Sequence, residues 1–245
     1  MISTNSSEKS MNDWFLFEAT DDASFTMRFI NPETGIASEC MHSLRGAFSE
    51  TNYIYGQAIR TTLELNFDPS FLSVGLGLGY CETLLSALML QAKKKFYIES
   101  FEQDQRLREH FASWLSEAQI TPEFQKVYDQ TLNSASELSG VSSALVKTNL
   151  KNSPLHFRGL LTTDTEFEKQ FSCVLFDAFS SKSTPDLWTQ EFLESFFSKA
   201  CANQCIFATY ACTGVLKRAL KNCGFELDIR PGFSSKRDSS FAIRR

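Results

Sequence analysis

Three glycines at alternate positions constrain the fold of this chain more than any other feature. Gly75, Gly77 and Gly79 follow the short apolar run 71–74 and precede residues 82–93, in which apolar side chains recur at helical spacing. Glycine allows the backbone to turn sharply and to approach a flat or anionic ligand closely. The pattern therefore predicts a strand, a tight turn and a helix, with a ligand at the turn. A tight turn without any ligand is the alternative.

The rest of the chain continues to alternate between strand-like and helix-like segments. Short apolar runs predict strands, and longer segments with apolar residues three and four apart predict helices. This alternation predicts an α/β fold of Rossmann-like type, a mostly parallel sheet with helices on both faces that binds its ligands beyond the carboxyl ends of the strands. The expected strands are 24–30, 95–101, 155–159, 171–177, 204–210, 225–229 and 240–243, and the expected helices are 55–65, 106–118, 188–199 and 214–222, with a further helix ending within 141–149.

The length of 245 residues suits one large α/β domain with a small appendage. We expect residues 1–13 to be a disordered tail, residues 14–68 to be a small β-rich extension, and residues 69–245 to be the core. Seven cysteines without a C-x-x-C pair disfavour a zinc site. No apolar run approaches the ~20 residues of a membrane span, and the N-terminus lacks a secretory signal. We therefore expect a cytoplasmic protein with no metal and no membrane contact.

The net charge of −5 is distributed unevenly. Residues 214–245 carry eight basic and three acidic side chains, so the remainder of the chain is acidic. A basic end on an acidic body fits a local contact with a polyanion. A solvated charged surface is the alternative explanation.

Two acidic residues stand at the ends of expected strands. Glu102 follows the strand 95–101, and a carboxylate there can accept hydrogen bonds from both hydroxyls of a ribose. Asp177 closes the strand 171–177, where a carboxylate can hold a substrate amine. Glu99 lies on the opposite face from Glu102 by the two-residue period of a strand. A solvated Glu102 and a loop-capping Asp177 are the alternatives.

A series of motifs resembles those of the MnmC-like methyltransferases, which methylate the aminomethyl group of a modified wobble uridine in tRNA. The G-x-G-x-G spacing differs from that of dinucleotide-binding enzymes and is usual for S-adenosylmethionine enzymes. The resemblance runs from about residue 20 to the C-terminus, with little to match at 121–155. Its motifs are D-x-S-x-T at 22–26, H-S-x-x-G-A-x-x-E at 42–50, G-x-G-x-G at 75–79, S-x-E at 100–102, D-A-F with P-x-x-W at 177–188, and the closing segments 209–220 and 232–237.

The resemblance implies a methyltransferase fold that uses S-adenosyl-L-methionine as cofactor and tRNA as partner. It implies cofactor contacts from Gly75, Gly77, Gly79, Glu102 and Gly159, with Asp177 as the catalytic residue. The extension 14–68 is expected to form part of the substrate pocket, with Tyr53 and Tyr55 in its wall, although core packing would also explain these tyrosines. A stand-alone methyltransferase, without the oxidoreductase half of some relatives, is expected. The expected substrate contacts come from His42, Glu50, Phe179, Lys217, Arg218, Lys236 and Arg237.

Two departures from the family pattern keep other functions open. Ser73 stands where the family's glycine loop begins with an acid, and Leu160 stands where an acid is expected beside the adenine. These changes favour a degenerate, non-catalytic relative that acts as a binding or scaffold module. A methyltransferase of the same fold with a different amine substrate is the other alternative. The glycine spacing disfavours a nicotinamide-dependent dehydrogenase.

Overall fold

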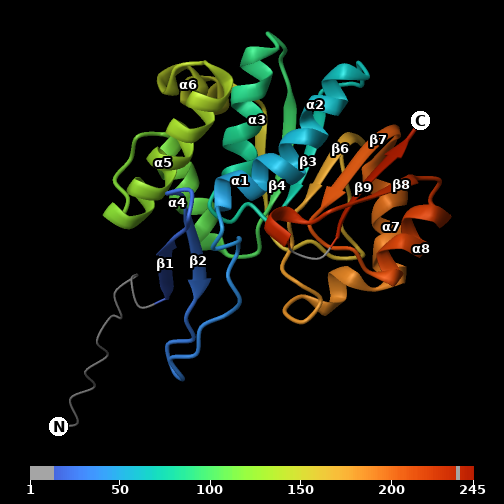
Figure 1. The fold of residues 1–245 in the computed structure, drawn as a ribbon, viewed down its shortest axis with the longest axis horizontal. Helices are drawn as coiled ribbons and strands as arrows, with labels where there is room; N and C mark the ends of the chain where they lie inside the picture. The colour runs from blue at the N-terminus through green and yellow to red at the C-terminus, as the bar shows by residue number, and fades with distance from the viewer. Residues whose placement is uncertain (1–13, 236–237) are drawn as a thin grey trace.

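A seven-stranded sheet forms the centre of the computed structural model, which describes residues 14–235 and 238–245 (Figure 1). Its strands are arranged in the order β5-β4-β3-β6-β7-β9-β8. All neighbours from β5 to β7 pair in parallel, whereas β9 is antiparallel to both β7 and β8. The strands are β3 (Ser70–Val74), β4 (Tyr97–Phe101), β5 (Leu155–Arg158), β6 (Phe171–Phe176), β7 (Cys201–Thr209), β8 (Glu226–Arg230) and β9 (Ser239–Arg244).

Helices cover both faces of this sheet, as the alternation of the sequence predicts. One apolar cluster joins the sheet to α2 (Gln57–Glu64), α3 (Tyr80–Gln91) and α4 (Gln105–Leu115). A second cluster joins the other face to α7 (Gln190–Ala200) and α8 (Gly214–Asn222). The central strands β3 and β6 are buried over their whole length because both of their faces are covered. The predicted Rossmann-like α/β class is confirmed.

The strand order reverses between β3 and β6, and this reversal determines where a ligand can bind. Both strands begin connections that leave in opposite directions along the sheet, to β4 and to β7. Their carboxyl ends therefore diverge and leave a crevice. Ser73 pairs with Ser100 of β4 and with Leu175 of β6, so the ends of the three strands lie level.

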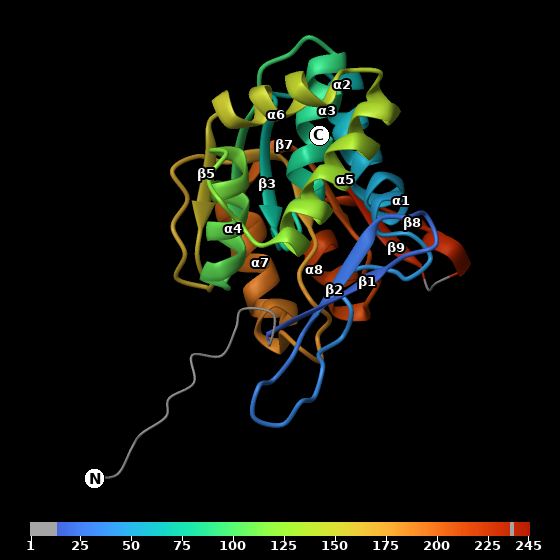
Figure 2. The same ribbon diagram turned by 90° about the vertical axis from the view of Figure 1, so that its left-hand side faces the viewer.

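Two helices that the sequence interpretation largely missed cover α3 from outside. They are α5 (Pro122–Ser139) and α6 (Ser143–Asn152), and both pack against α3 (Figure 2). The helix α5 begins with Pro122 in its first turn and ends at Gly140, whose φ of 69° suits a helix terminus. The expected helix end at 141–149 overlaps residues 143–149 of α6, which continues to Asn152.

The N-terminal part of the described chain forms a two-stranded hairpin and a helical segment. The hairpin pairs β1 (Phe15–Ala19) with β2 (Phe25–Phe29), which confirms the strand expected at 24–30. The helical segment is longer than expected: α1 (Ala47–Thr51) continues through the π-helix η2 (Asn52–Gly56) into α2. Because α2 packs against β6 and β7, the helical layer of the sheet starts before residue 69. The exact domain boundary stays a prediction.

No helix within 14–235 or 238–245 combines the length and the apolar character needed to cross a membrane.

Candidate cofactor and substrate site

A pocket of about 970 Å³ opens at the carboxyl ends of β3, β4, β5 and β6. This volume is within the usual range for small-molecule sites. The loops after these strands line one part of it, through Gly75, Gly77, Glu102 and Gly159. Residues 39–45 of the N-terminal segment line another part. The fold thus brings four of the expected cofactor residues to the same cavity as the expected substrate residue His42.

The glycine turn is tight enough that side chains are excluded at two of its positions. Gly75 has φ 96°, and a Cβ there would lie 2.5 Å from the carbonyl oxygen of Asp177. Gly79 has φ 70°, and a Cβ there would lie 2.2 Å from the ring of Phe111. Gly77, with φ 50°, lines the pocket. The three glycines therefore serve different purposes: Gly75 permits contact with the β6 loop, Gly79 permits helix packing, and Gly77 brings the backbone to the pocket wall.

Glu102 is held rigidly at the pocket edge. Its carboxylate accepts hydrogen bonds from the backbone N–H of Gly77 and of Asp104, each at 3.0 Å. Burial raises the pKa of Glu102, and these two backbone hydrogen bonds act in the opposite direction. Each carboxylate oxygen has two lone pairs, so both can still accept a hydroxyl. This arrangement fits the vicinal diol of an adenosine ribose.

Glu99 has a different role, as its expected place on the opposite face implies. Its carboxylate pairs with Arg158 at 2.8 Å and accepts a hydrogen bond from the Tyr97 hydroxyl at 2.9 Å. The Glu99 side chain is 1% exposed. Its hydrogen-bonding capacity is therefore used within the protein.

The cavity beside Glu102 fits the remainder of an adenosine. Phe101 and Leu161 supply buried apolar surface there, and a Cβ added at Gly159 would meet no atom within 4 Å, so this glycine leaves space. Leu160 lies on the rim and is 64% exposed. A flat apolar base suits such walls, because apolar surfaces are removed from water on contact. The residues present thus fit S-adenosylmethionine, with Glu102 and the glycine turn as the groups that would hold it.

Replacing Glu102 by Gln is expected to weaken binding of S-adenosylhomocysteine by tenfold to a hundredfold. A hydrogen bond to a charged group contributes about 1.5–3 kcal/mol, and every 1.4 kcal/mol is tenfold in affinity. Titration calorimetry measures the change. Glu109→Gln is the matched control, because Glu109 is an exposed acid in α4 that accepts a hydrogen bond from Gln105 and does not line the pocket. Equal affinities of the two variants for S-adenosylhomocysteine would contradict the role of Glu102 in holding the cofactor.

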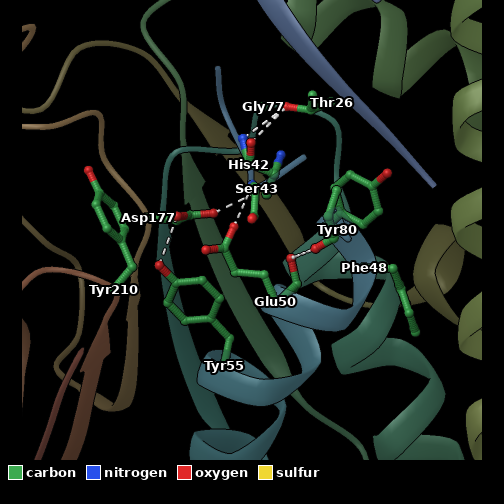
Figure 3. Close-up of polar contacts among 12 residues, drawn as sticks. Thr26, His42, Ser43, Phe48, Glu50, Tyr55, Gly77, Tyr80, Asp177 and Tyr210 are labelled. Atoms are coloured by element: carbon green, nitrogen blue, oxygen red, sulfur yellow. Dashed lines mark hydrogen bonds and ion pairs between the residues drawn. The ribbon is translucent and has the colours of Figure 1, made fainter. Parts of the chain in front are cut away.

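Asp177 lies at the centre of the other half of the pocket (Figure 3). Its side chain is 13% exposed, its Oδ1 accepts a hydrogen bond from the Tyr55 hydroxyl at 2.8 Å, and its Oδ2 lies 3.6 Å from Nε2 of His42. Burial raises the pKa of Asp177, while His42 and Tyr55 oppose this and the nearby charge of Glu50 adds to it. A carboxylate so placed is a better proton acceptor than a solvated one.

The N-terminal segment supplies the three side chains that converge on Asp177. Tyr55 projects from the π-helix η2, a type of helix that is frequent at functional sites. Thr26 fixes His42 by accepting from its backbone N–H at 2.9 Å and donating to its carbonyl at 3.3 Å. Glu50 accepts from the Ser43 backbone N–H at 2.6 Å. The 42–50 motif is thus folded into one wall of the site.

The 22–26 motif supports this wall without reaching the pocket. Asp22 accepts a hydrogen bond from the backbone N–H of Ser49 at 2.9 Å, and Ser24 accepts from those of Ala47 and Phe48. Hydrogen bonds from neighbouring hydroxyl and amide groups outweigh burial and lower the pKa of Asp22 to about 2. These acceptors satisfy the free N–H groups that begin α1.

Two pocket residues were missed by the sequence interpretation. Tyr210 lies at the end of β7, donates a hydrogen bond to the Ala178 carbonyl at 3.0 Å, and faces the carboxylates of Asp177, Glu39 and Glu50, which together with burial raise its pKa. Glu39 accepts hydrogen bonds from the backbone and side chain of Ser180. Tyr210 could have been found in the same way as Asp177, because it also stands at the end of an expected strand. No local pattern in the sequence marks Glu39.

The expected substrate residues are only partly brought together. His42, Glu50 and Phe179 line the pocket. Lys217 and Arg218 lie on α8 outside it, and Arg218 reaches Gln190 at 3.5 Å. Lys236 and Arg237 fall outside the described residues. Their roles stay predictions.

Three other basic residues of the C-terminal segment are used within the fold. Arg244 donates to the backbone carbonyls of Cys201, Ala202 and Cys223. Arg230 and Arg245 form ion pairs with Asp228 and Glu226. Because the two ion pairs also use two of the three acids in residues 214–245, only Arg244 lowers the basic excess of this segment.

Nowhere in the described part of the chain do three or more His, Cys, Asp or Glu side chains gather in a way that could hold a metal ion.

Comparisons with known proteins identify relatives of this chain. A model of a family described as S-adenosyl-L-methionine-dependent methyltransferase matches residues 118–245. The chain is 36% identical over 67 residues, 27% of its length, to the tRNA 5-methylaminomethyl-2-thiouridine biosynthesis bifunctional protein MnmC of Hahella chejuensis. It is 24% identical over 198 residues, 80% of its length, to the protein of the same name from Campylobacter hominis. These matches cover only 10% and 28% of the two bifunctional proteins.

A solved structure supports the same fold. The crystal structure of MnmC2 from Aquifex aeolicus matches 93% of this chain and 70% of that chain, with a TM-score of 0.62 and 22% sequence identity. This structure supports the fold alone, and together with the family model and the MnmC relatives it confirms the resemblance that the sequence motifs indicate.

Proposed function

The chain belongs to the S-adenosyl-L-methionine-dependent methyltransferase family, and on this premise we propose that it transfers the cofactor's methyl group to the amino nitrogen of a modified wobble uridine in tRNA. The observation that carries the proposal is the buried Asp177 carboxylate, held by Tyr55 in the same pocket as Glu102 and the glycine turn. Relatives named for 5-methylaminomethyl-2-thiouridine biosynthesis support the choice of nucleotide. Such a substrate would place the work of the chain in the cytoplasm.

The charges of the pocket favour an amine as the methyl acceptor. Asp177 and Glu50 interact electrostatically, and both face the Tyr210 hydroxyl. A substrate ammonium between these carboxylates would gain from both negative charges in a partly buried site. Over the whole lining, acidic side chains outnumber arginines: the acids are Glu39, Glu50, Glu102, Asp177, Asp186 and Glu191, and the arginines are Arg28 and Arg45.

The reaction then requires the protein mainly to position the methyl donor and the amine and to supply a proton acceptor. S-adenosylmethionine supplies an electrophilic methyl carbon on its sulfonium sulfur. Asp177 would accept a proton from the substrate ammonium, and this would free the nitrogen lone pair for the methyl group that the bound cofactor would supply, with S-adenosylhomocysteine as the other product. Tyr55 keeps the carboxylate oriented through its 2.8 Å hydrogen bond. The burial of Asp177 keeps competing water away.

The burial of the Asp177 carboxylate implies how a tRNA base would bind. A base in a stacked loop does not reach a buried carboxylate, so the nucleotide would have to turn out of the stack into the pocket. Phe179 on the pocket wall offers an aromatic ring for stacking. Phosphate contacts from Lys217, Arg218, Lys236 and Arg237 belong to this proposal, and they would guide the backbone while the pocket selects the base.

A methylation assay with matched substrates tests the proposal. Purified protein is incubated with labelled S-adenosylmethionine and either tRNA that carries a wobble 5-aminomethyluridine or the same tRNA without the aminomethyl group. We expect labelling only of the first, with the methylamino nucleoside as the product after digestion. If both tRNAs stayed unlabelled and a small amine added in their place were labelled, the substrate would be a different amine. If the protein did not bind S-adenosylhomocysteine at millimolar concentration, a scaffold role would be favoured.

Removing the basic side chains of Lys217 and Arg218 on α8 is expected to change tRNA binding and leave cofactor binding unaltered. The double change Lys217→Gln and Arg218→Gln should weaken tRNA binding by several-fold and flatten the dependence of log K on log salt by up to about two units, one for each phosphate that the variant no longer neutralises. Filter binding over a salt series measures this. Because neither residue lines the pocket, the affinity for S-adenosylhomocysteine should stay unchanged. An unaltered salt slope would remove these residues from the interface.

A further inference from the structure

A buried carboxyl group that the proposed chemistry does not use lies behind the glycine turn. Glu82 is in the first turn of α3, three residues after Gly79, and its residue is 0% exposed. Its Oε1 accepts a hydrogen bond from the Ser100 hydroxyl of β4 at 2.6 Å. Its Oε2 is buried without a hydrogen-bond partner. A half-satisfied buried carboxyl group is costly, so its presence calls for an explanation.

The groups around Glu82 supply no compensating cation. Ser73 of β3 lies near enough to favour its charged form, although no hydrogen bond of normal geometry joins them and the Ser73 hydroxyl has no other partner. From α5 the Tyr128 hydroxyl faces it, also without a hydrogen-bond partner. From its own helix the Cys81 thiol lies close, and beyond β6 the Asp177 carboxyl interacts with it. Among the described residues, no lysine, arginine or histidine forms an ion pair with Glu82.

We propose that Glu82 is a positioning residue whose buried negative charge makes the glycine turn prefer the cationic S-adenosylmethionine to the product S-adenosylhomocysteine. The two ligands differ by the methyl group and by the positive charge of the sulfonium. The turn that precedes Glu82 lines the pocket through Gly75 and Gly77, and the interaction between Glu82 and Asp177 spans the same region. A charge in such a low-dielectric setting acts over several ångströms with little screening. The bound sulfonium would be the cation that this carboxylate lacks within the protein.

The preference should depend on pH in a defined direction. Burial raises the pKa of Glu82 to about 7, while Ser100 and Ser73 oppose the rise and Asp177 adds to it. Below this pKa the carboxyl group is neutral and attracts no cation. Above it the group is charged. The preference for S-adenosylmethionine should therefore be small at low pH and should increase as the pH rises through about 7.

Titration calorimetry of Glu82→Gln with each ligand tests the proposal. The measured quantity is the ratio of the two affinities, one pH unit below and one above ~7. We expect the ratio in the unmodified protein to rise with pH. In Glu82→Gln we expect the ratio to be about tenfold lower at the higher pH, with a smaller rise that reflects the ligands and Asp177 alone. A merely structural role would weaken both ligands equally. An unchanged ratio in a variant with native circular dichroism and melting temperature would overturn the proposal.

A second variant keeps the test valid if Glu82→Gln does not fold. Ser100→Ala removes the 2.6 Å hydrogen bond that favours the charged carboxylate. The rise of the affinity ratio should then shift to higher pH, and a rise at the unmodified pH would contradict the proposal. Glu109→Gln, an exposed acid on α4, serves as the control with an unchanged ratio. The inference depends on the cofactor alone, so a failure of the tRNA assay would leave these binding results interpretable.

Discussion

Asp177→Asn is expected to lower the turnover number by roughly a hundredfold to ten-thousandfold, the range for losing a positioned proton acceptor. The amide retains the size of the carboxyl group and can still accept the Tyr55 hydrogen bond, which is 2.8 Å long in the unmodified protein. It has no negative charge and cannot take the proton of an ammonium. Binding of S-adenosylhomocysteine, which depends on Glu102 and the glycine turn, should change by no more than about twofold. Steady-state kinetics at saturating cofactor measures the first effect and calorimetry measures the second.

The pH profile gives an independent readout of the same residue. The pKa of Asp177 is raised by burial, so the carboxylate becomes protonated at a higher pH than a solvated aspartate would. Turnover should fall as the pH decreases through this raised pKa. The residual activity of Asp177→Asn should not show this decrease. Asp164→Asn, an exposed acid whose side chain does not line the pocket, is the control with unchanged kinetics. Loss of cofactor binding in Asp177→Asn without any other change would contradict the role assigned to Asp177.

Gly75→Ala is expected to abolish detectable cofactor binding and to lower the free energy of unfolding by roughly 2–5 kcal/mol. Two costs combine: a left-handed backbone angle in a residue with a Cβ costs roughly 1–2 kcal/mol, and overpacking costs roughly 1–3 kcal/mol. The clash is with the backbone carbonyl of Asp177, at 2.5 Å, which has little freedom to move away. The change would therefore push apart the two loops that form the site. Urea denaturation measures the decrease in stability, and calorimetry measures the decrease in affinity.

Gly140→Ala separates these two costs. Gly140 has φ 69° but no atom within 4 Å of a Cβ, so an alanine there meets strain without a clash. We expect a decrease of about 1 kcal/mol in unfolding free energy and unchanged cofactor affinity. If Gly75→Ala behaved like Gly140→Ala, the close approach of the two loops would be refuted.

The parts of the site that follow strands could be predicted from the sequence. In a parallel sheet the topology fixes where each strand ends, so an acid after an apolar run is placed at the ligand edge without knowledge of its neighbours. Glu102 and Asp177 are predictable in this way, and both line the pocket. The glycine turn is predictable because its backbone geometry depends on the glycines themselves.

The partners of these residues depend on contacts between distant parts of the chain. Tyr55 reaches Asp177 from 122 positions away, through a π-helix that no local pattern marks. The Glu39 carboxylate joins Ser180 from 141 positions away. The helix α5 is not among the expected helices, although its buried residues Phe124, Val127 and Tyr128 begin a regular helical spacing and Pro122 and Gly140 stand at its ends. Glu82 resembles an ordinary first-turn acid in the sequence, and only the structure reveals that it is buried.

A crystal structure with S-adenosylhomocysteine bound would show whether Glu102, the glycine turn and Asp177 form one methyl-transfer site. We expect the ribose hydroxyls to contact the Glu102 carboxylate and the sulfur to lie over the glycine turn with its open side toward Asp177. A ligand bound outside this pocket, or a sulfur separated from Asp177 by intervening side chains, would contradict this expectation.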